Sequence, residues 1–142
     1  MRLLVDTNVF LDLLLKRESG CKEALDFFIW CKKSRNQTYI TSMSLRDIEY
    51  IAGRKLHDKE KAKSVLSGVY CLCSKVIGIS ADAAITSIYE EYKNFEDELI
   101  IQAAKEAMLD AIITNNIKDF ANCDIPVYKP EELVALAEKH SC

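Results

Sequence analysis

Residues 3–8 read Leu-Leu-Val-Asp-Thr-Asn, a short apolar run that stops at a carboxylate. The apolar run predicts a buried strand, and the residues from Val9 to Leu15 have the apolar spacing of a helix. We therefore expect Asp6 where a buried strand gives way to a helix, which in open α/β sheets is the crevice that binds ligands. A charge in such a place needs a partner, and a divalent cation is one candidate.

The bulk composition predicts one globular domain over residues 1–142. The chain is 49% hydrophobic and 29% charged, with only four Gly and two Pro. Its apolar runs are too short for a membrane span and residues 1–20 lack the features of a signal peptide, so we expect a cytoplasmic protein with no membrane partner. A net charge of -3 argues against a general nucleic-acid coat protein. It does not exclude a nuclease, because bound Mg²⁺ can offset a cluster of acids.

The cysteines do not have the spacing of a zinc site. No CxxC pair exists and the chain has only two histidines. We expect reduced thiols that pack as small apolar residues. The six are Cys21, Cys31, Cys71, Cys73, Cys123 and Cys142.

Strand and helix patterns alternate along the rest of the chain. Further strands are predicted at 38–41, 76–79, 111–114 and 125–128, and Pro126 favours a sheet edge for the last. Helices are predicted around 24–30, 42–53, 58–70, 81–92 and 96–108, and from Pro130 onward; Ser42 or Ser44 is the expected cap of the second. The helix at 81–92 has Ala81, Ala84, Ile85, Ile88 and Tyr92 on one apolar face. This alternation predicts the α/β class, with a parallel sheet and helices on both faces.

Four carboxylates stand where they could face one end of such a sheet. Asp6 and Asp119 follow strands, Asp47 lies early in the helix after the second strand, and Asp97 opens the helix before the strand at 111–114. Converging carboxylates repel one another, and a hard cation with oxygen ligands relieves that cost. Mg²⁺ or Mn²⁺ held in this way can activate water and stabilise charge on a phosphoryl group.

Each acid also has a purely local explanation. Asp6 or Asn8 could cap a helix, the acids at 96–98 could complement a helix dipole, and Asp119 could be a turn residue. The order of the acids along the chain is what favours a metal site.

Four segments carry a resemblance to a known family. They are residues 3–9 with Asp6, residues 40–48 with Asp47, residues 94–99 with Asp97, and residues 114–120, Thr-Asn-Asn-Ile-Lys-Asp-Phe. In this order they resemble the motifs of the PIN-domain nucleases, which include the VapC-type toxins of bacterial toxin–antitoxin pairs.

The resemblance implies a three-layer α/β/α sandwich around a mostly parallel sheet of about five strands. It also implies dependence on Mg²⁺ or Mn²⁺, hydrolysis of RNA phosphodiester bonds, a homodimer and an antitoxin protein as partner. Asp6, Asp47 and Asp97 would bind the metal directly or through water, and Asn8 and Thr114 would be positioning groups.

The chain departs from the family pattern in two places. The second motif usually carries Glu, and here Asp47 fits its register while Glu49 lies two residues further on. The fourth acid of the family falls on Asn116, so Asp119 is the alternative fourth ligand. Arg46 is a candidate for contacting phosphate, and an ion pair is an equal alternative for it.

The first hypothesis is a metal-dependent endoribonuclease in which Asp6, Asp47 and Asp97 hold the cation and Asp119 or Asn116 completes the site. The second is a haloacid-dehalogenase-like phosphatase with Asp6 as covalent nucleophile, although such enzymes carry an acid where this chain has Asn8. The third is a catalytically weak or inactive PIN-like domain that binds protein or RNA, which Asn116 keeps open.

Overall fold

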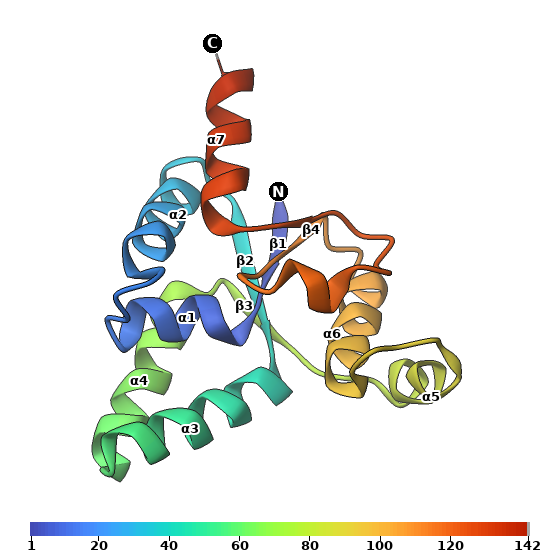
Figure 1. Ribbon diagram of the computed structural model, residues 1–142, viewed down its shortest axis with the longest axis horizontal. Helices are drawn as coiled ribbons and strands as arrows, with labels where there is room; N and C mark the ends of the chain where they lie inside the picture. The colour runs from blue at the N-terminus through green and yellow to red at the C-terminus, as the bar shows by residue number, and fades with distance from the viewer. Residues whose placement is uncertain (142) are drawn as a thin grey trace.

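A five-stranded parallel sheet forms the centre of the computed structural model, which describes residues 1–141 (Figure 1). The strands are β1 (Arg2–Val5), β2 (Gln37–Thr41), β3 (Lys75–Ile77), β4 (Ala111–Ile113) and β5 (Val127–Tyr128). Their order across the sheet is β3-β2-β1-β4-β5, and every neighbouring pair is parallel. The predicted class and strand number are therefore confirmed, and β5 is an edge strand as Pro126 suggested.

Seven α-helices and one 3₁₀-helix connect these strands in the described part of the chain. They are α1 (Thr7–Leu14), α2 (Cys21–Lys33), α3 (Ser42–Leu56), α4 (Lys59–Leu72), α5 (Ala81–Tyr89), α6 (Phe95–Glu106), η1 (Ile117–Phe120) and α7 (Pro130–His140). Figure 1 shows α1 to α4 on one side of the sheet and α5 and α6 on the other. None of the helices within residues 1–141 is long and apolar enough to cross a lipid bilayer.

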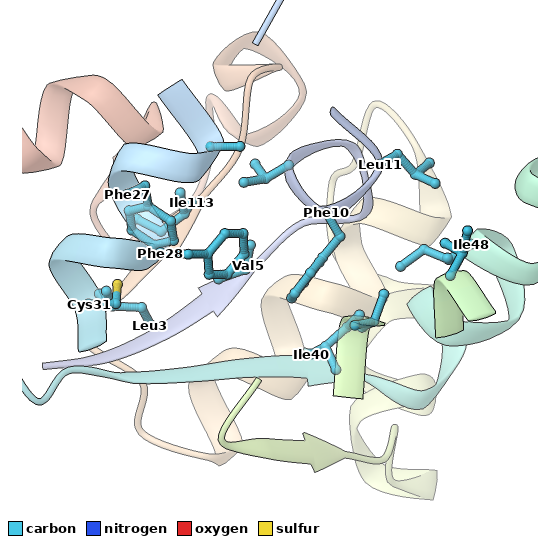
Figure 2. Packing of buried hydrophobic residues seen from close by; sticks show 14 of the residues in the cluster. Leu3, Val5, Phe10, Leu11, Phe27, Phe28, Cys31, Ile40, Ile48 and Ile113 are labelled. Carbon is cyan, nitrogen blue, oxygen red and sulfur yellow. The ribbon is translucent and has the colours of Figure 1, made fainter. Parts of the chain in front are cut away.

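Side chains of β1 alternate between two hydrophobic cores, as the period of a strand requires. Leu3 and Val5 pack with α1, α2 and α3, while Leu4 packs with α6 on the opposite face. Figure 2 shows the first core, where the rings of Phe10 and Phe28 lie 5.3 Å apart. Both faces of the sheet are thus covered, which gives the three-layer sandwich.

Two details of the predicted helices are wrong. The cap of α3 is Thr41, whose hydroxyl accepts a hydrogen bond from the amide of Ser44, not Ser42 or Ser44. Helix α5 ends at Tyr89, and Ile85 and Ile88 on its apolar face are more than half exposed. The helix instead buries small residues, Ala83 and Ser87, at its contact with the rest of the molecule.

The five cysteines in the described residues have free thiols, as expected. Cys31 lies in the first core, where burial raises its pKa to about 12. Such a thiol is protonated at neutral pH and serves as packing. Cys142 lies outside the described residues.

The sheet has one topological switch point, between β1 and β4. The chain proceeds from β1 to β2 and β3 in one direction, and then to β4 and β5 in the other. Ligands in open α/β sheets bind at the carboxyl ends of the strands beside such a point. The residues that follow β1 and β4 are Asp6 and Thr114.

Candidate active site

Asp6 lies at the carboxyl end of β1 and caps α1. Its Oδ1 accepts a hydrogen bond of 2.8 Å from the amide of Thr7. Its Oδ2 accepts one of 2.8 Å from the Thr114 hydroxyl and one of 3.2 Å from the Asn8 amide group. Burial raises the pKa of Asp6, while the bonds from Thr114 and Thr7 act in the opposite direction. Asp6 is therefore both the N-cap of α1 and a carboxylate held at the carboxyl end of β1.

The loop after β4 holds these donors in place. Thr114 is fully buried, and its hydroxyl oxygen also accepts a hydrogen bond of 3.0 Å from the amide of Asn116. The amide of Asn115 donates to the side-chain oxygen of Asn8 at 3.3 Å. The loop is therefore tied to Asp6 both directly and through Asn8.

Asp47 comes from the second turn of α3. Its Oδ1 receives an ion pair of 2.9 Å from Arg46, whose side chain is 80% exposed. Asp47 lines the same crevice as Asp6, whereas Glu49 is exposed and does not line it. The helix thus presents Asp47 and not Glu49 to the site.

Asp97 and Glu96 come from the first turn of α6, which Asn94 caps. The pKa of Asp97 is raised to about 6, first by burial and then by the negative charges of Asp6 and Asp119. The pKa of Glu96 is raised to about 7, first by its hydrogen bond with the Asp47 carboxylate. Carboxylates whose charges raise the pKa values of Glu96 and Asp97 in this way lie close to them.

We define the acidic crevice as the hollow of about 500 Å³ whose lining includes Asp6, Asp47, Glu96, Asp97 and Asn116. Asn8 and Arg46 line it too. Thr114 lies beneath it as the buried donor to Asp6. Side chains from α1, α3 and α6 and from the loop after β4 are thus brought to one place at the switch point.

Asp119 stands next to the acidic crevice and not in it. It lies on η1 and lines a neighbouring hollow of about 80 Å³ together with Asp97 and Lys93. Its Oδ1 is 3.6 Å from the Lys93 ammonium group. Its charge nevertheless raises the pKa values of Asp6 and Asp97.

The residues of the acidic crevice fit a hard divalent cation by their chemistry. Carboxylate and amide oxygens are the ligands that Mg²⁺ takes, and Asp6, Asp97 and Glu96 carry charge that their surroundings disfavour. Within residues 1–141, no three His, Cys, Asp or Glu side chains lie close enough together to hold one ion between them. An ion in the acidic crevice would therefore be bound by one or two carboxylates directly, with water in its other positions.

The family model that matches this chain is that of the PIN domain, over residues 2–118. The chain belongs to the PIN domain family. The match includes Asp6, Asp47, Asp97, Thr114 and Asn116 and ends one residue before Asp119.

Solved structures of VapBC, FitAB and VapC proteins have the same fold as this PIN domain. VapBC2 of Rickettsia felis bound to promoter DNA has a TM-score of 0.66 at 21% identity, over 91% of this chain and 98% of that one. FitAB bound to a DNA fragment has a TM-score of 0.68 at 16% identity, over 91% and 95% of the chains. VapC20 of Mycobacterium tuberculosis, a toxin that cleaves the sarcin–ricin loop, has a TM-score of 0.60 at 14% identity, over 78% and 86%. No curated protein matches this chain.

Glu96 is the residue of this PIN domain that sequence reasoning missed as part of the site. It was interpreted only as a complement to the dipole of α6. The available signal was the run of three acids at 96–98, because a helix turn needs no more than one or two of them at its start. The third, Glu98, is buried, lines the neighbouring hollow together with Asp119, and accepts a hydrogen bond from Gln102.

Proposed function

We propose that this PIN domain is a metal-dependent endoribonuclease. The observation that carries the proposal is the acidic crevice, in which Asp6, Asp47, Glu96 and Asp97 meet at the switch point of the sheet. Membership of the PIN family supports a nuclease, and a structurally similar toxin is described as cleaving RNA.

Asp6 and Asp97 would hold Mg²⁺ or Mn²⁺, and Asp47 would help through a water molecule bound to the ion. When bound, the ion supplies positive charge beside the phosphate and makes water a better nucleophile. Asp6 has three protein donors on its two oxygens, and a carboxylate has about four lone-pair positions, so one direction remains for the ion. Asn8 and Thr114 fix the Asp6 carboxylate so that it need not reorganise when substrate arrives.

Glu96 is the group in the crevice whose proton can move at neutral pH. In the metal-free protein its pKa is raised to about 7, so protonated and ionised forms coexist there at neutral pH. The Glu96 carboxyl group, hydrogen-bonded to Asp47, could take a proton from the attacking water or give one to the leaving ribose oxygen. Either step requires the RNA backbone to enter the acidic crevice, with Arg46 at its mouth to attract phosphate.

Asn116 and Asp119 would complete the metal environment from the β4 side. Asn116 offers only a neutral amide where the family pattern has an acid, and Asp119 is turned toward Lys93. A second ion would therefore bind more weakly than the first. The alternative function, a PIN-like domain that binds protein or RNA without cleaving it, is supported by the same neutral Asn116.

The toxin role is a further part of the proposal. Several structurally similar proteins are toxin–antitoxin complexes, so we propose an antitoxin protein whose segment covers the acidic crevice, a homodimeric assembly and a cytoplasmic location. Co-expression with a small reading frame from the neighbouring gene, followed by size-exclusion chromatography with light scattering, tests the complex and the dimer together.

The decisive test compares Asp6→Asn and Asp97→Asn with Glu49→Gln, a control acid on α3 outside the crevice. Loss of a metal ligand should lower RNA cleavage in Mg²⁺ by about 10³-fold, because several kcal/mol of transition-state stabilisation disappear. Glu49→Gln should cleave like the wild type. Urea denaturation checks that all three variants fold. Cleavage that persists in both Asn variants contradicts the proposal, and absence of Mn²⁺ binding by the wild type in calorimetry favours the inactive alternative.

A further inference from the structure

Arg17 lies where the acidic crevice meets a second hollow. This second hollow, also of about 500 Å³, is lined by Ser19, Asn115 and Lys129 and by the acids Glu23 and Glu131. Asn8, Arg17 and Asn116 line both hollows. An extended chain that passes through the crevice can therefore continue across these three residues into the second hollow.

A buried carboxylate holds Arg17 at this boundary. Asp12 on α1 is only 6% exposed, and its Oδ1 lies 3.3 Å from Nη1 of Arg17. Its Oδ2 accepts a hydrogen bond of 2.6 Å from the side chain of Asn115. A buried carboxylate is costly unless it is paired, so Asp12 constrains both partners strongly.

The backbone at Gly20 makes room for this carboxylate. Gly20 has φ of +109°, and a Cβ atom there would collide with Oδ2 of Asp12. The loop between α1 and α2 thus closes over Asp12 and fixes the base of Arg17. The sequence shows Ser19-Gly20 only as a break, and nothing in it marks Asp12 as buried.

Arg17 keeps most of its hydrogen-bonding capacity for a ligand. In the described chain its guanidinium group makes one side-chain hydrogen bond, to Asp12, and the side chain is one-third exposed. A guanidinium group has five N–H donors in a fixed fork that matches phosphate. Arg46 differs, since it is 80% exposed and its contact is with Asp47 in the crevice itself.

We propose that Arg17 binds the phosphate of the nucleotide next to the scissile phosphodiester bond, and that Asp12 is its positioning residue. The RNA strand then runs from the acidic crevice over Asn8 and Asn116 into the second hollow. The proposal rests on the endoribonuclease function and adds to it the path and the second phosphate contact of a single-stranded substrate.

The test uses a single-stranded RNA oligonucleotide that the wild type cleaves, with and without one uncharged methylphosphonate linkage beside the cleaved bond. The neutral linkage is placed first on one side of the cleaved bond and then on the other. In one of these two positions it should raise the KM of the wild type about tenfold, because the charge-assisted contact with Arg17 is lost. Arg17→Gln should have the raised KM with the ordinary RNA and no further response to the neutral linkage. Its kcat should stay within about threefold of the wild type, since the metal ligands are intact.

Two further variants define the role of Asp12 and the importance of the fork. Asp12→Asn should raise KM in the same direction, and adding it to Arg17→Gln should cost nothing more, as expected for a residue that acts through another. Arg17→Lys keeps the positive charge but not the forked guanidinium group, so its KM should lie between those of the wild type and Arg17→Gln. The matched control is Arg35→Gln, an exposed arginine just before β2 at the other end of the strands. It should behave like the wild type.

Calorimetric titration with Mn²⁺ separates failure of this inference from failure of the proposed function. Wild type, Arg17→Gln and Arg35→Gln should bind Mn²⁺ alike. If the wild type cleaves RNA but Arg17→Gln and Arg17→Lys match Arg35→Gln in KM and in their response to the neutral linkage, the inference is overturned alone. If the wild type neither binds Mn²⁺ nor cleaves RNA, the proposed function falls and this inference falls with it.

Discussion

The two sides of the acidic crevice are built in different ways. On the β1–β4 side, Asp6 accepts hydrogen bonds from Thr7, Asn8 and the buried Thr114. On the α3–α6 side, Asp47 has the exposed Arg46 as its cationic partner, and Glu96 and Asp97 have raised pKa values. One side is thus fixed by donors, although burial raises the pKa of Asp6 as well. The other side has fewer donors, and the pKa values of Glu96 and Asp97 are raised by the hydrogen bond with Asp47 and by burial, respectively, and then by repulsion from neighbouring acids.

This difference indicates how the site would work. Fixed donors cost no reorganisation when a ligand binds, so the β1–β4 side sets the position of the ion. Uncompensated acids gain most from added positive charge, so the α3–α6 side supplies much of the driving force for binding a cation. Changes on the first side should therefore affect structure and affinity, and changes on the second should affect the response to pH and metal.

Among the residues that surround the metal-binding carboxylates, the largest effect is expected at Thr114. Thr114→Val keeps the shape but leaves the amide of Asn116 without its acceptor and removes a donor from Asp6. Because Thr114 is fully buried, we expect the free energy of unfolding to fall by about 1–3 kcal/mol. The affinity for Mn²⁺ should fall about 10–100-fold, as is typical for residues that orient a metal ligand. Urea denaturation and calorimetric titration measure the two quantities.

Two matched variants sharpen this prediction. Thr114→Ser restores the hydroxyl and should recover most of the Mn²⁺ affinity, whereas Thr86→Val, on the exposed side of α5, should change neither quantity. If Thr114→Val bound Mn²⁺ as tightly as Thr114→Ser, the β1–β4 side would not set the position of the ion.

The sequence predicts this side of the site better than the other. Leu3 to Val5 is an apolar run that ends at a carboxylate, so Asp6 could be placed at a strand end, and the closing motif of the PIN resemblance marked Thr114. That β1 and β4 are neighbours is shown by the structure. The contacts of α6 depend on how it packs against the sheet, which its apolar pattern does not specify. Asp97 was therefore identified through its motif, while Glu96 beside it was interpreted as part of a helix start.

An intermediate effect is expected from pH on the metal-free protein. In the unfolded chain Asp97 and Glu96 have ordinary pKa values of 3.8 and 4.5, and folding raises them to about 6 and about 7. Between these limits the folded state binds more protons at these two groups, so their contribution to stability is greatest below the unfolded pKa values and is lost as pH rises through about 6 and about 7. We expect Tm to be a few degrees lower at pH 7.5 than at pH 5.

Variants of the α3–α6 side test whether Asp97 and Glu96 cause this pH dependence of Tm. Asp97→Asn and Glu96→Gln should each flatten the fall in Tm, while Glu49→Gln should keep it. Mn²⁺ added at pH 7.5 should raise the Tm of the wild type, because an ion that binds only the folded state stabilises it. If Tm fell with pH equally steeply in all variants, Asp97 and Glu96 would not be the groups that cause the pH dependence.

Two other features show why tertiary packing cannot be read from apolar patterns alone. The face of α5 with Ile85 and Ile88 predicts burial, but the helix buries Ala83 and Ser87, since small side chains allow close approach. Asp12 is the opposite case, a carboxylate on an apolar helix that is buried and paired because Asn115 reaches it from a distant position and Arg17 from the loop that follows the helix. In both cases the deciding partner lies outside the local sequence.

The smallest effect is expected at Arg46, on the exposed rim of the α3–α6 side. Arg46→Gln breaks the ion pair with Asp47, but an ion pair with an 80% exposed partner contributes little, so the free energy of unfolding should change by less than about 0.5 kcal/mol. The Arg46 charge lowers the pKa of Glu96, so its loss should move the limb of the pH–rate profile that reports Glu96 toward higher pH. This is the acidic limb if Glu96 acts as the base and the basic limb if it acts as the acid. Cleavage rates between pH 5.5 and 8.5 measure this shift, with Arg35→Gln as the control. A profile unchanged by Arg46→Gln would mean that Glu96 does not titrate in the catalytic step, and the proton transfer assigned to it would then belong to another group of the crevice.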